Sequence, residues 1–230
     1  MQGWRKRMED AHISDIGLGP SGQTHLFGVF DGHGGKEVSQ FVKKHFTQEF
    51  LNSKSLKSGN FKNSLIETFL HLDELMLESA GKAELKQYAK QSKEEDEIRN
   101  QKDKNKQMDL FKQLFDYKNQ EDCDVAMMTG CTAHVCAIDQ AGKRLYFANS
   151  GDSRAVLCRN GVAYPMSIDH KPDLDGEKTR IYKADGWVSE GRVKGIHFLK
   201  ESFIFCKVFT FDFVEISSFS LLIHLFKLLF

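Results

Sequence analysis

A run of short apolar segments and tight turns between residues 132 and 161 constrains the fold more than any other feature. The apolar segments are 132–138, 144–149 and 155–159. Strands this short and this closely spaced pair antiparallel, and Asn160-Gly161 is typical of a two-residue hairpin turn. This part of the chain is therefore predicted to form antiparallel sheet.

Helical patterns flank these strands. A strand expected at 24–30 leads through Gly34-Gly35 into a helix whose apolar residues recur at spacings of three and four. Those residues are Val38, Phe41, Val42 and Phe46. Two more helices are expected at 61–79 and at about 176–184. Helices combined with antiparallel strands predict an α+β protein.

Two segments differ in composition from the rest. Between residues 82 and 122, 20 of 41 side chains are charged, ten of each sign, which predicts an exposed helical or disordered insertion. Nine of the 19 phenylalanines fall in residues 196–230 without a regular period. We interpret this segment as a Phe-rich, non-homologous tail, and a membrane-surface segment is the alternative.

Charge and cysteine content exclude several classes of protein. The 32 basic and 32 acidic side chains give a net charge of zero, which argues against a nucleic-acid partner. Five cysteines without a Cys-x-x-Cys pair predict free thiols in a reducing compartment, the cytoplasm or the nucleus.

No stretch reaches the roughly 18 apolar residues of a membrane span, so the tail is the only hint of a membrane. We expect a monomer.

The most informative motif for chemistry is Asp31-Gly32-His33, placed where a strand ends and a helix begins. A carboxylate there points beyond the sheet edge, and the Gly32 carbonyl can approach a cation because no side chain shields it. Hard cations such as Mg²⁺ and Mn²⁺ prefer these oxygen ligands. The alternative is a loop in which Asp31 caps the helix and His33 is only a polar surface residue.

A second polar run lies near the start of the chain. If it is extended, Arg5, Arg7 and Glu9 share one face and Asp10 points to the other. An arginine fork suits phosphate oxygens, and Glu9 suits a metal or its waters. The alternative is a solvated edge strand. Asp152, in a tight turn between two strands, is either a further ligand or a turn former.

Taken together, several motifs resemble the metal-dependent protein serine/threonine phosphatases of type 2C. The matching segments are Met1 to Arg5, Met8 to His12, Val29 to Gly35, Asn149 to Arg154, Asp169 to Pro172, Glu177 to Ile181 and Gly191 to Gly195. The likeness covers residues 1–195 apart from the charged insertion. It implies a four-layer α-β-β-α sandwich around two stacked antiparallel sheets.

The same resemblance implies a role for each matching residue. Asp31 would bridge two Mg²⁺ or Mn²⁺ ions, and the Gly32 carbonyl and Glu9 would both serve one of these ions. Asp10 would orient a water held by a metal, and Asp152 would bind a weaker third ion. Two catalytic residues complete the site: Arg5 would hold the phosphate of a phosphoprotein substrate, and His33 would protonate the leaving seryl or threonyl oxygen.

The chain also departs from that pattern. Family members carry two further metal-binding aspartates, in an Asp-Gly-x-Trp-Asp segment and an Asp-Asn pair, and this sequence contains neither. We therefore expect a partial domain over residues 1–195, incomplete at both termini, with weakened metal binding. Two functions follow: a Mg²⁺- or Mn²⁺-dependent phosphoprotein phosphatase, or a catalytically inactive relative that binds phosphoprotein or partner chains. A P-loop and a cysteine-nucleophile phosphatase motif are both missing from the sequence.

Overall fold

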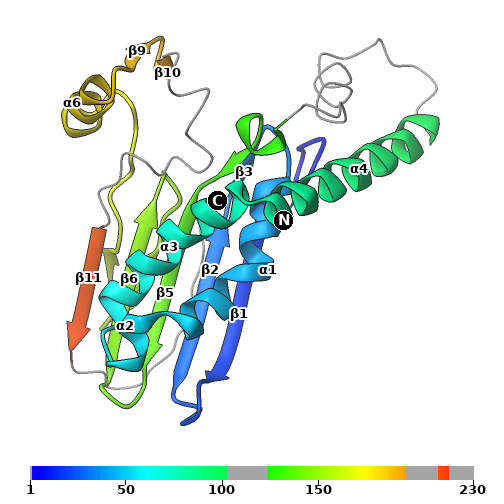
Figure 1. Ribbon diagram of the computed structural model, residues 1–230. Coiled ribbons are helices and arrows are strands. Elements are labelled where there is room, and N and C mark those ends of the chain that lie inside the picture. Colours follow the sequence, from blue (N-terminus) through cyan, green and yellow to red (C-terminus); the bar gives the residue numbers. More distant parts are fainter. Residues whose placement is uncertain (1, 103–123, 195–211, 218–230) are drawn as a thin grey trace.

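A five-stranded antiparallel sheet forms the centre of the protein. The computed structural model describes residues 2–102, 124–194 and 212–217 (Figure 1). The sheet has the strand order β1-β2-β5-β6-β11, and each strand is antiparallel to its neighbour. Its strands are β1 (Ala11–Leu18), β2 (Thr24–Phe30), β5 (Ala133–Asp139), β6 (Arg144–Ser150) and β11 (Asp212–Ser217). The mixed α+β class predicted from the sequence is confirmed.

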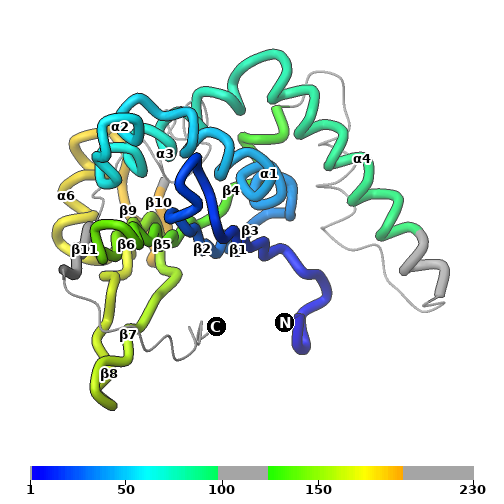
Figure 2. Tube along the Cα trace, turned by 90° about the horizontal axis from the view of Figure 1, so that it is seen from below, coloured from blue at the N-terminus to red at the C-terminus, as the bar shows by residue number. Residues whose placement is uncertain are grey.

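Helices cover one face of this sheet (Figure 2). They are α1 (Glu37–Asn52), α2 (Lys54–Lys57) and α3 (Phe61–Leu77), whereas α4 (Ser79–Lys102) packs against α1 and α3 and runs beyond the sheet (Figure 2). Period-two alternation in β5 turns Ala133, Val135 and Ala137 toward the helices, where they join the main core. Phe46 of α1 meets Phe69 of α3 edge to face at a centroid distance of 5.5 Å. Each fully buried Phe contributes about 2–3 kcal/mol of hydrophobic stabilisation.

The opposite face of the sheet carries a smaller apolar cluster. Its buried members are Cys136, Leu145, Phe147, Ala155 and Met166. The hairpin of β7 (Val156–Arg159) and β8 (Val162–Pro165) lies on this side (Figure 2). Asn160 and Gly161 have φ values of 53° and 77°, as a type I′ turn requires, so the predicted hairpin turn is confirmed.

The remaining elements lie near one end of the sheet. Two short strands pair there, β3 (Gly32–His33) with β4 (Gly130–Cys131), and the 3₁₀ turn η1 (Val125–Met127) precedes β4. Helix α6 (Asp175–Lys183) is followed by the hairpin of β9 (Trp187–Ser189) and β10 (Arg192–Lys194). All three helices expected from the sequence are present, with ends that differ by a few residues.

The charged segment is helical as far as Lys102, within α4. The expectation that it is exposed is wrong for one face, because Leu85 and Ala89 are completely buried against the core. Residues 103–122 lie outside the described residues. None of the helices in the described ranges is both long and apolar enough to cross a membrane.

Of the Phe-rich tail at 196–230, the structure describes the six residues of β11, which pair with β6. The tail thus contributes one strand to the sheet, and the rest of it lies outside the described residues. Three cysteines, Cys131, Cys136 and Cys158, are free, as the sequence predicted for them. Cys123 and Cys206 lie outside the described ranges.

Candidate metal and phosphate site

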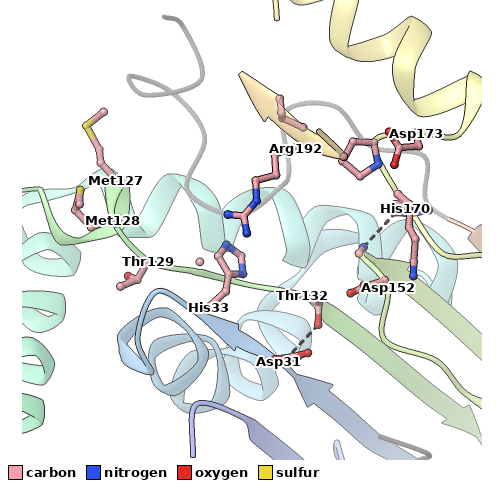
Figure 3. A pocket seen from close by; sticks show the side chains of 17 residues that line it. Asp31, His33, Met127, Met128, Thr129, Thr132, Asp152, His170, Asp173 and Arg192 are labelled. Atoms are coloured by element: carbon pink, nitrogen blue, oxygen red, sulfur yellow. Dashed lines mark hydrogen bonds between the residues drawn. The ribbon is translucent and has the colours of Figure 1, made fainter. Parts of the chain in front are cut away.

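Asp31 stands where β2 ends, and two hydrogen bonds tie it to the start of β5. Its backbone N–H donates to Thr132 Oγ1 at 3.2 Å, and the Thr132 N–H donates to the Asp31 carbonyl oxygen at 2.9 Å. Thr132 Oγ1 also lies 2.6 Å from Ser153 Oγ. Thr132 therefore joins the Asp31 loop to the turn that carries Asp152 (Figure 3).

Position 32 must be a glycine because another part of the backbone approaches it closely. A Cβ at this position would lie 2.3 Å from the Glu9 carbonyl oxygen and 3.0 Å from the Gly35 carbonyl oxygen. No side chain fits in that space. The Glu9 carbonyl also accepts a hydrogen bond from Ser39 Oγ of α1 at 2.5 Å. The segment that carries Glu9 is therefore packed directly on the Asp31-Gly32 loop.

The N-terminal residues are not the extended strand that was considered. Strand β1 begins only at Ala11, and residues 2–10 form turns and irregular backbone. The predicted alternation is wrong: Asp10 and Arg5 both act electrostatically on the Asp31 carboxyl group. Arg7 instead pairs with Asp96 of α4. Irregular backbone does not keep the strict two-residue period of a strand.

The acidic surroundings of Asp31 perturb its ionisation. Partial burial and the neighbouring Asp10 and Asp152 raise the pKa of Asp31 to about 6, and the positive charge of Arg5 acts in the opposite direction. Two carboxyl groups and one guanidinium thus act on the Asp31 carboxyl, which leaves an excess of negative charge when all are ionised. A divalent cation would relieve that excess.

Carboxylate oxygens match the preference of Mg²⁺ and Mn²⁺, so the donor chemistry fits these ions. Among the residues that the structure describes, no group of three or more His, Cys, Asp or Glu side chains is already arranged as a metal site. Ions bound here would therefore take part of their ligand shell from water or backbone carbonyls, as Mg²⁺ commonly does.

A cavity of about 680 Å³ opens beside Asp31 and Asp152. Asp31, His33 and Asp152 lie in its wall, and Arg192 of β10 points into it toward His33 (Figure 3). Desolvation by the surrounding walls lowers the pKa of His33, and the Asp152 carboxylate opposes this effect. The imidazole therefore favours its neutral form more than a free histidine does.

Two cavity residues, His170 and Arg192, were given no role from the sequence, although both lie in segments that carry the resemblance. His170 Nδ1 accepts a hydrogen bond from the Gly151 N–H at 3.2 Å, and the His170 N–H donates to the Gly151 carbonyl at 3.0 Å. His170 thus holds the backbone next to Asp152. In the sequence, the Asp169-His170-Lys171-Pro172 motif could have pointed to His170 as a site residue.

An ion pair and an amide fix the same turn from outside the cavity. Arg154 binds Asp169 through two hydrogen bonds of 2.6 Å. The Asn149 amide nitrogen donates to the carbonyls of Gly151 (3.1 Å) and Ile168 (3.0 Å). The Asp152 turn is therefore held from several sides at once.

The site residues lie near Asp31, but Asp31, His33 and Asp152 line the cavity and Arg5, Glu9, Asp10 and Gly32 do not. The structure brings Arg5, Asp10, Asp31 and Asp152 into electrostatic contact and places Asp31, His33 and Asp152 on one cavity. Gly32 joins them through the backbone, next to the carbonyl of Glu9. For Glu9, the contacts described above are those of its backbone and not of its carboxylate.

Comparison with known proteins gives a consistent assignment. Residues 1–87 and 75–202 match the family model described as Protein phosphatase 2C. Protein phosphatase 2C 1 of Paramecium tetraurelia is 44% identical over 195 residues, which are 85% of this chain and 53% of that protein. Probable protein phosphatase 2C 21 of Arabidopsis thaliana is 39% identical over 202 residues, 85% of this chain and 55% of that protein. The chain spans about half the length of these curated relatives.

Two solved structures share the fold. A C. elegans sex determining protein superposes with a TM-score of 0.60 at 21% identity, covering 94% of this chain and 46% of that one. Serine-threonine phosphatase 2C from Toxoplasma gondii gives a TM-score of 0.57 at 16% identity, covering 94% and 71%. The family model and the sequence identity together carry the conclusion: this chain belongs to the protein phosphatase 2C family.

Proposed function

We propose that the protein hydrolyses phosphoserine and phosphothreonine esters in phosphoproteins with the help of Mg²⁺ or Mn²⁺. One observation carries the proposal: Arg5, Asp10 and Asp152 all act on Asp31 beside a cavity of about 680 Å³. A phosphoryl group needs a cationic fork, and a divalent ion needs carboxylates. This arrangement offers both at one place.

The chain's own residues would divide the work. Asp31, the Gly32 carbonyl and Glu9 would hold two ions, Asp10 would orient a water held by a metal, and Asp152 would hold a weaker third ion. Bound there, the ions would supply an acidified water as nucleophile and offset the charge of the phosphoryl group.

The Arg5 guanidinium would bind and orient the phosphate oxygens through its planar fork. His33, at the cavity wall, would give a proton to the departing seryl or threonyl oxygen. A serine or threonine alkoxide is a poor leaving group, so a positioned proton donor accelerates its departure. Since the pKa of His33 is lowered, only part of the protein carries this proton at neutral pH.

We also infer the wider architecture and setting from the family. The apolar cluster around Cys136 and Phe147 on the helix-free face of the sheet supports a second stacked sheet and the four-layer arrangement. Residues 1–195 would form the phosphatase part, to whose sheet the Phe-rich tail adds β11. Free cysteines support the cytoplasm or nucleus, and we propose a monomer acting on phosphoprotein substrates.

The test compares hydrolysis of a phosphothreonine peptide by the wild-type chain and by Asp31→Asn, with manganese and with a chelator. We expect manganese-dependent release of phosphate from the wild type and a loss of roughly a hundredfold or more in the variant, since charge stabilisation supplies a large part of such barriers. Asp185→Asn is the matched control. Asp185 has a φ of 59°, which asparagine tolerates. Turnover that persists in chelator, or in Asp31→Asn, would refute the proposal.

The inactive phosphoprotein-binding relative is a second candidate because of what the sequence and the described residues lack. The chain has no Asp-Asn pair and no Asp-Gly-x-Trp-Asp segment, and the described residues contain no complete metal cluster. For this candidate we expect equal inactivity of wild type and Asp31→Asn together with retained binding of a phosphothreonine peptide. Fluorescence anisotropy of a labelled peptide measures that binding.

A further inference from the structure

The segment that carries Arg5, Glu9 and Asp10 has little regular structure to hold it. Residues 2–10 belong to no helix or strand, and sheet pairing begins with Ala11 opposite Phe30. Within the segment, Gln2 Nε2 donates to the carbonyls of Arg5 (2.8 Å) and Lys6 (3.1 Å). These local bonds shape the turn but do not fix it to the body of the protein. The Ser39 hydroxyl of α1 holds the end of the segment at the Glu9 carbonyl, and a further side-chain anchor is needed closer to Arg5.

Arg7 provides such an anchor, and its partner comes from α4. Arg7 Nε donates to Asp96 Oδ1 at 3.2 Å, and Arg7 Nη2 pairs with Asp96 Oδ2. The two side chains are only 22% and 16% exposed. A two-point, half-buried guanidinium–carboxylate pair restricts orientation as well as distance.

Helix α4 is itself held firmly, so it can serve as a fixed support. Its Leu85 and Ala89 are completely buried, and its Glu84 accepts hydrogen bonds from Lys44 (2.8 Å) and His45 (2.9 Å) of α1. In Figure 1, α4 runs past the end of the sheet where β2 leads into β3. That end is where Asp31 lies.

We propose that Asp96 is a positioning residue that acts through Arg7 to place Arg5 and Asp10 at the Asp31 site. The inference deepens the proposed phosphatase function and rests on it. Arg7 lies two residues after Arg5 and three before Asp10, so fixing its side chain limits how far either can move. Small misplacements of groups that hold a substrate reduce rates steeply.

The neighbouring residue offers a matched control. Glu95 pairs with Lys36 at the start of α1, but the Glu95 side chain is 58% exposed. Exposed ion pairs contribute little to stability. Lys36 also lies outside residues 2–10, so its pair with Glu95 does not anchor the N-terminal segment. Glu95→Gln and Asp96→Asn each remove one acidic charge from adjacent positions on the same helix.

The experiment uses the full chain as wild type, Asp96→Asn, Glu95→Gln and the exchanged pair Arg7→Glu/Asp96→Arg. Hydrogen exchange measures protection of residues 2–10, calorimetry measures the affinity for inorganic phosphate with manganese, and a phosphothreonine peptide gives kcat and KM.

For Asp96→Asn we expect exchange in residues 2–10 to quicken about threefold or more while β2 and β5 stay protected. We also expect kcat/KM and phosphate affinity to fall roughly tenfold. Glu95→Gln should stay within about twofold of wild type, and the exchanged pair should regain most of the loss.

Unchanged exchange in residues 2–10, equal effects of Glu95→Gln and Asp96→Asn, or no recovery in the exchanged pair would each overturn the inference. A wild type that binds phosphate without turnover would refute only the phosphatase function. In that case, hydrogen exchange and phosphate affinity still decide the role of Asp96.

Discussion

At the scale of single residues, Thr132 connects the two halves of the site. Its hydroxyl accepts from the Asp31 N–H and lies within hydrogen-bond distance of Ser153, while a Cβ on Gly151 would meet the Thr132 methyl at 2.6 Å. The Thr132 hydroxyl therefore forms hydrogen bonds, and the Thr132 methyl packs closely against Gly151. Nothing in the sequence distinguishes this threonine from its neighbours in an apolar strand.

Thr132→Val keeps the shape of the side chain and removes the hydroxyl. We expect a loss of about 1–2 kcal/mol in the free energy of unfolding, because the Asp31 N–H loses its acceptor. Phosphatase activity should fall roughly tenfold as the two loops separate. Urea unfolding and peptide hydrolysis measure these effects, and Thr132→Ser is the control that should restore most of both. Wild-type activity in Thr132→Val would contradict this role.

At the scale of elements, local sequence signals predicted α1 and the β7–β8 turn but not the buried face of α4, which depends on tertiary packing. The spacing of Val38, Phe41, Val42 and Phe46 located α1, and Asn160-Gly161 located the β7–β8 turn, because both signals are local. The buried face of α4 was missed because Leu85 and Ala89 stand among charged residues, and only the tertiary contact with α1 and α3 shows that they are covered.

The same difference between local sequence signals and tertiary contacts applies to the site residues. Asp31, Gly32 and His33 were predictable because a short motif carries them. The irregular path of residues 2–10 was not, since it depends on the Arg7–Asp96 contact across 89 positions of sequence. The strict alternation assumed for that run fails once the chain leaves the sheet.

Leu85→Ala tests whether α4 belongs to the core. We expect a loss of about 2–4 kcal/mol in the free energy of unfolding, which is typical when a fully buried leucine is truncated. Lys86→Ala, at the next position of the same helix, should change stability by less than about 0.5 kcal/mol. Urea unfolding followed by circular dichroism measures both. Equal values for the two variants would mean that α4 is a solvated appendage.

At the scale of the whole molecule, ionisation of Asp31 lowers the free energy of unfolding when no cation is bound. The pKa of Asp31 is raised to about 6, so the folded chain holds this proton more tightly than the unfolded chain. Between the ordinary pKa of 3.8 and about 6, the unfolded state binds fewer protons. Stability therefore falls as the pH rises through this window.

Asp31→Asn should consequently raise the thermal midpoint of the metal-free protein at about pH 8, and the advantage should shrink toward about pH 4. Manganese should reverse the order, because an ion that binds the folded wild type at 100 times its Kd adds about 2.7 kcal/mol. Differential scanning calorimetry with and without chelator measures both effects. A variant that melts below the wild type in chelator at high pH would refute this electrostatic account.

The pairing of β2 with β5 sets the order of events when the chain is made. Asp31 is translated early, but the threonine that secures it comes 101 residues later, and Asp152 follows after that. A nascent chain on the ribosome therefore has no finished pocket until the β5–β6 hairpin has emerged and docked beside β2. Any chaperone that delays this docking also delays the moment at which the newborn protein has a complete cavity beside Asp31.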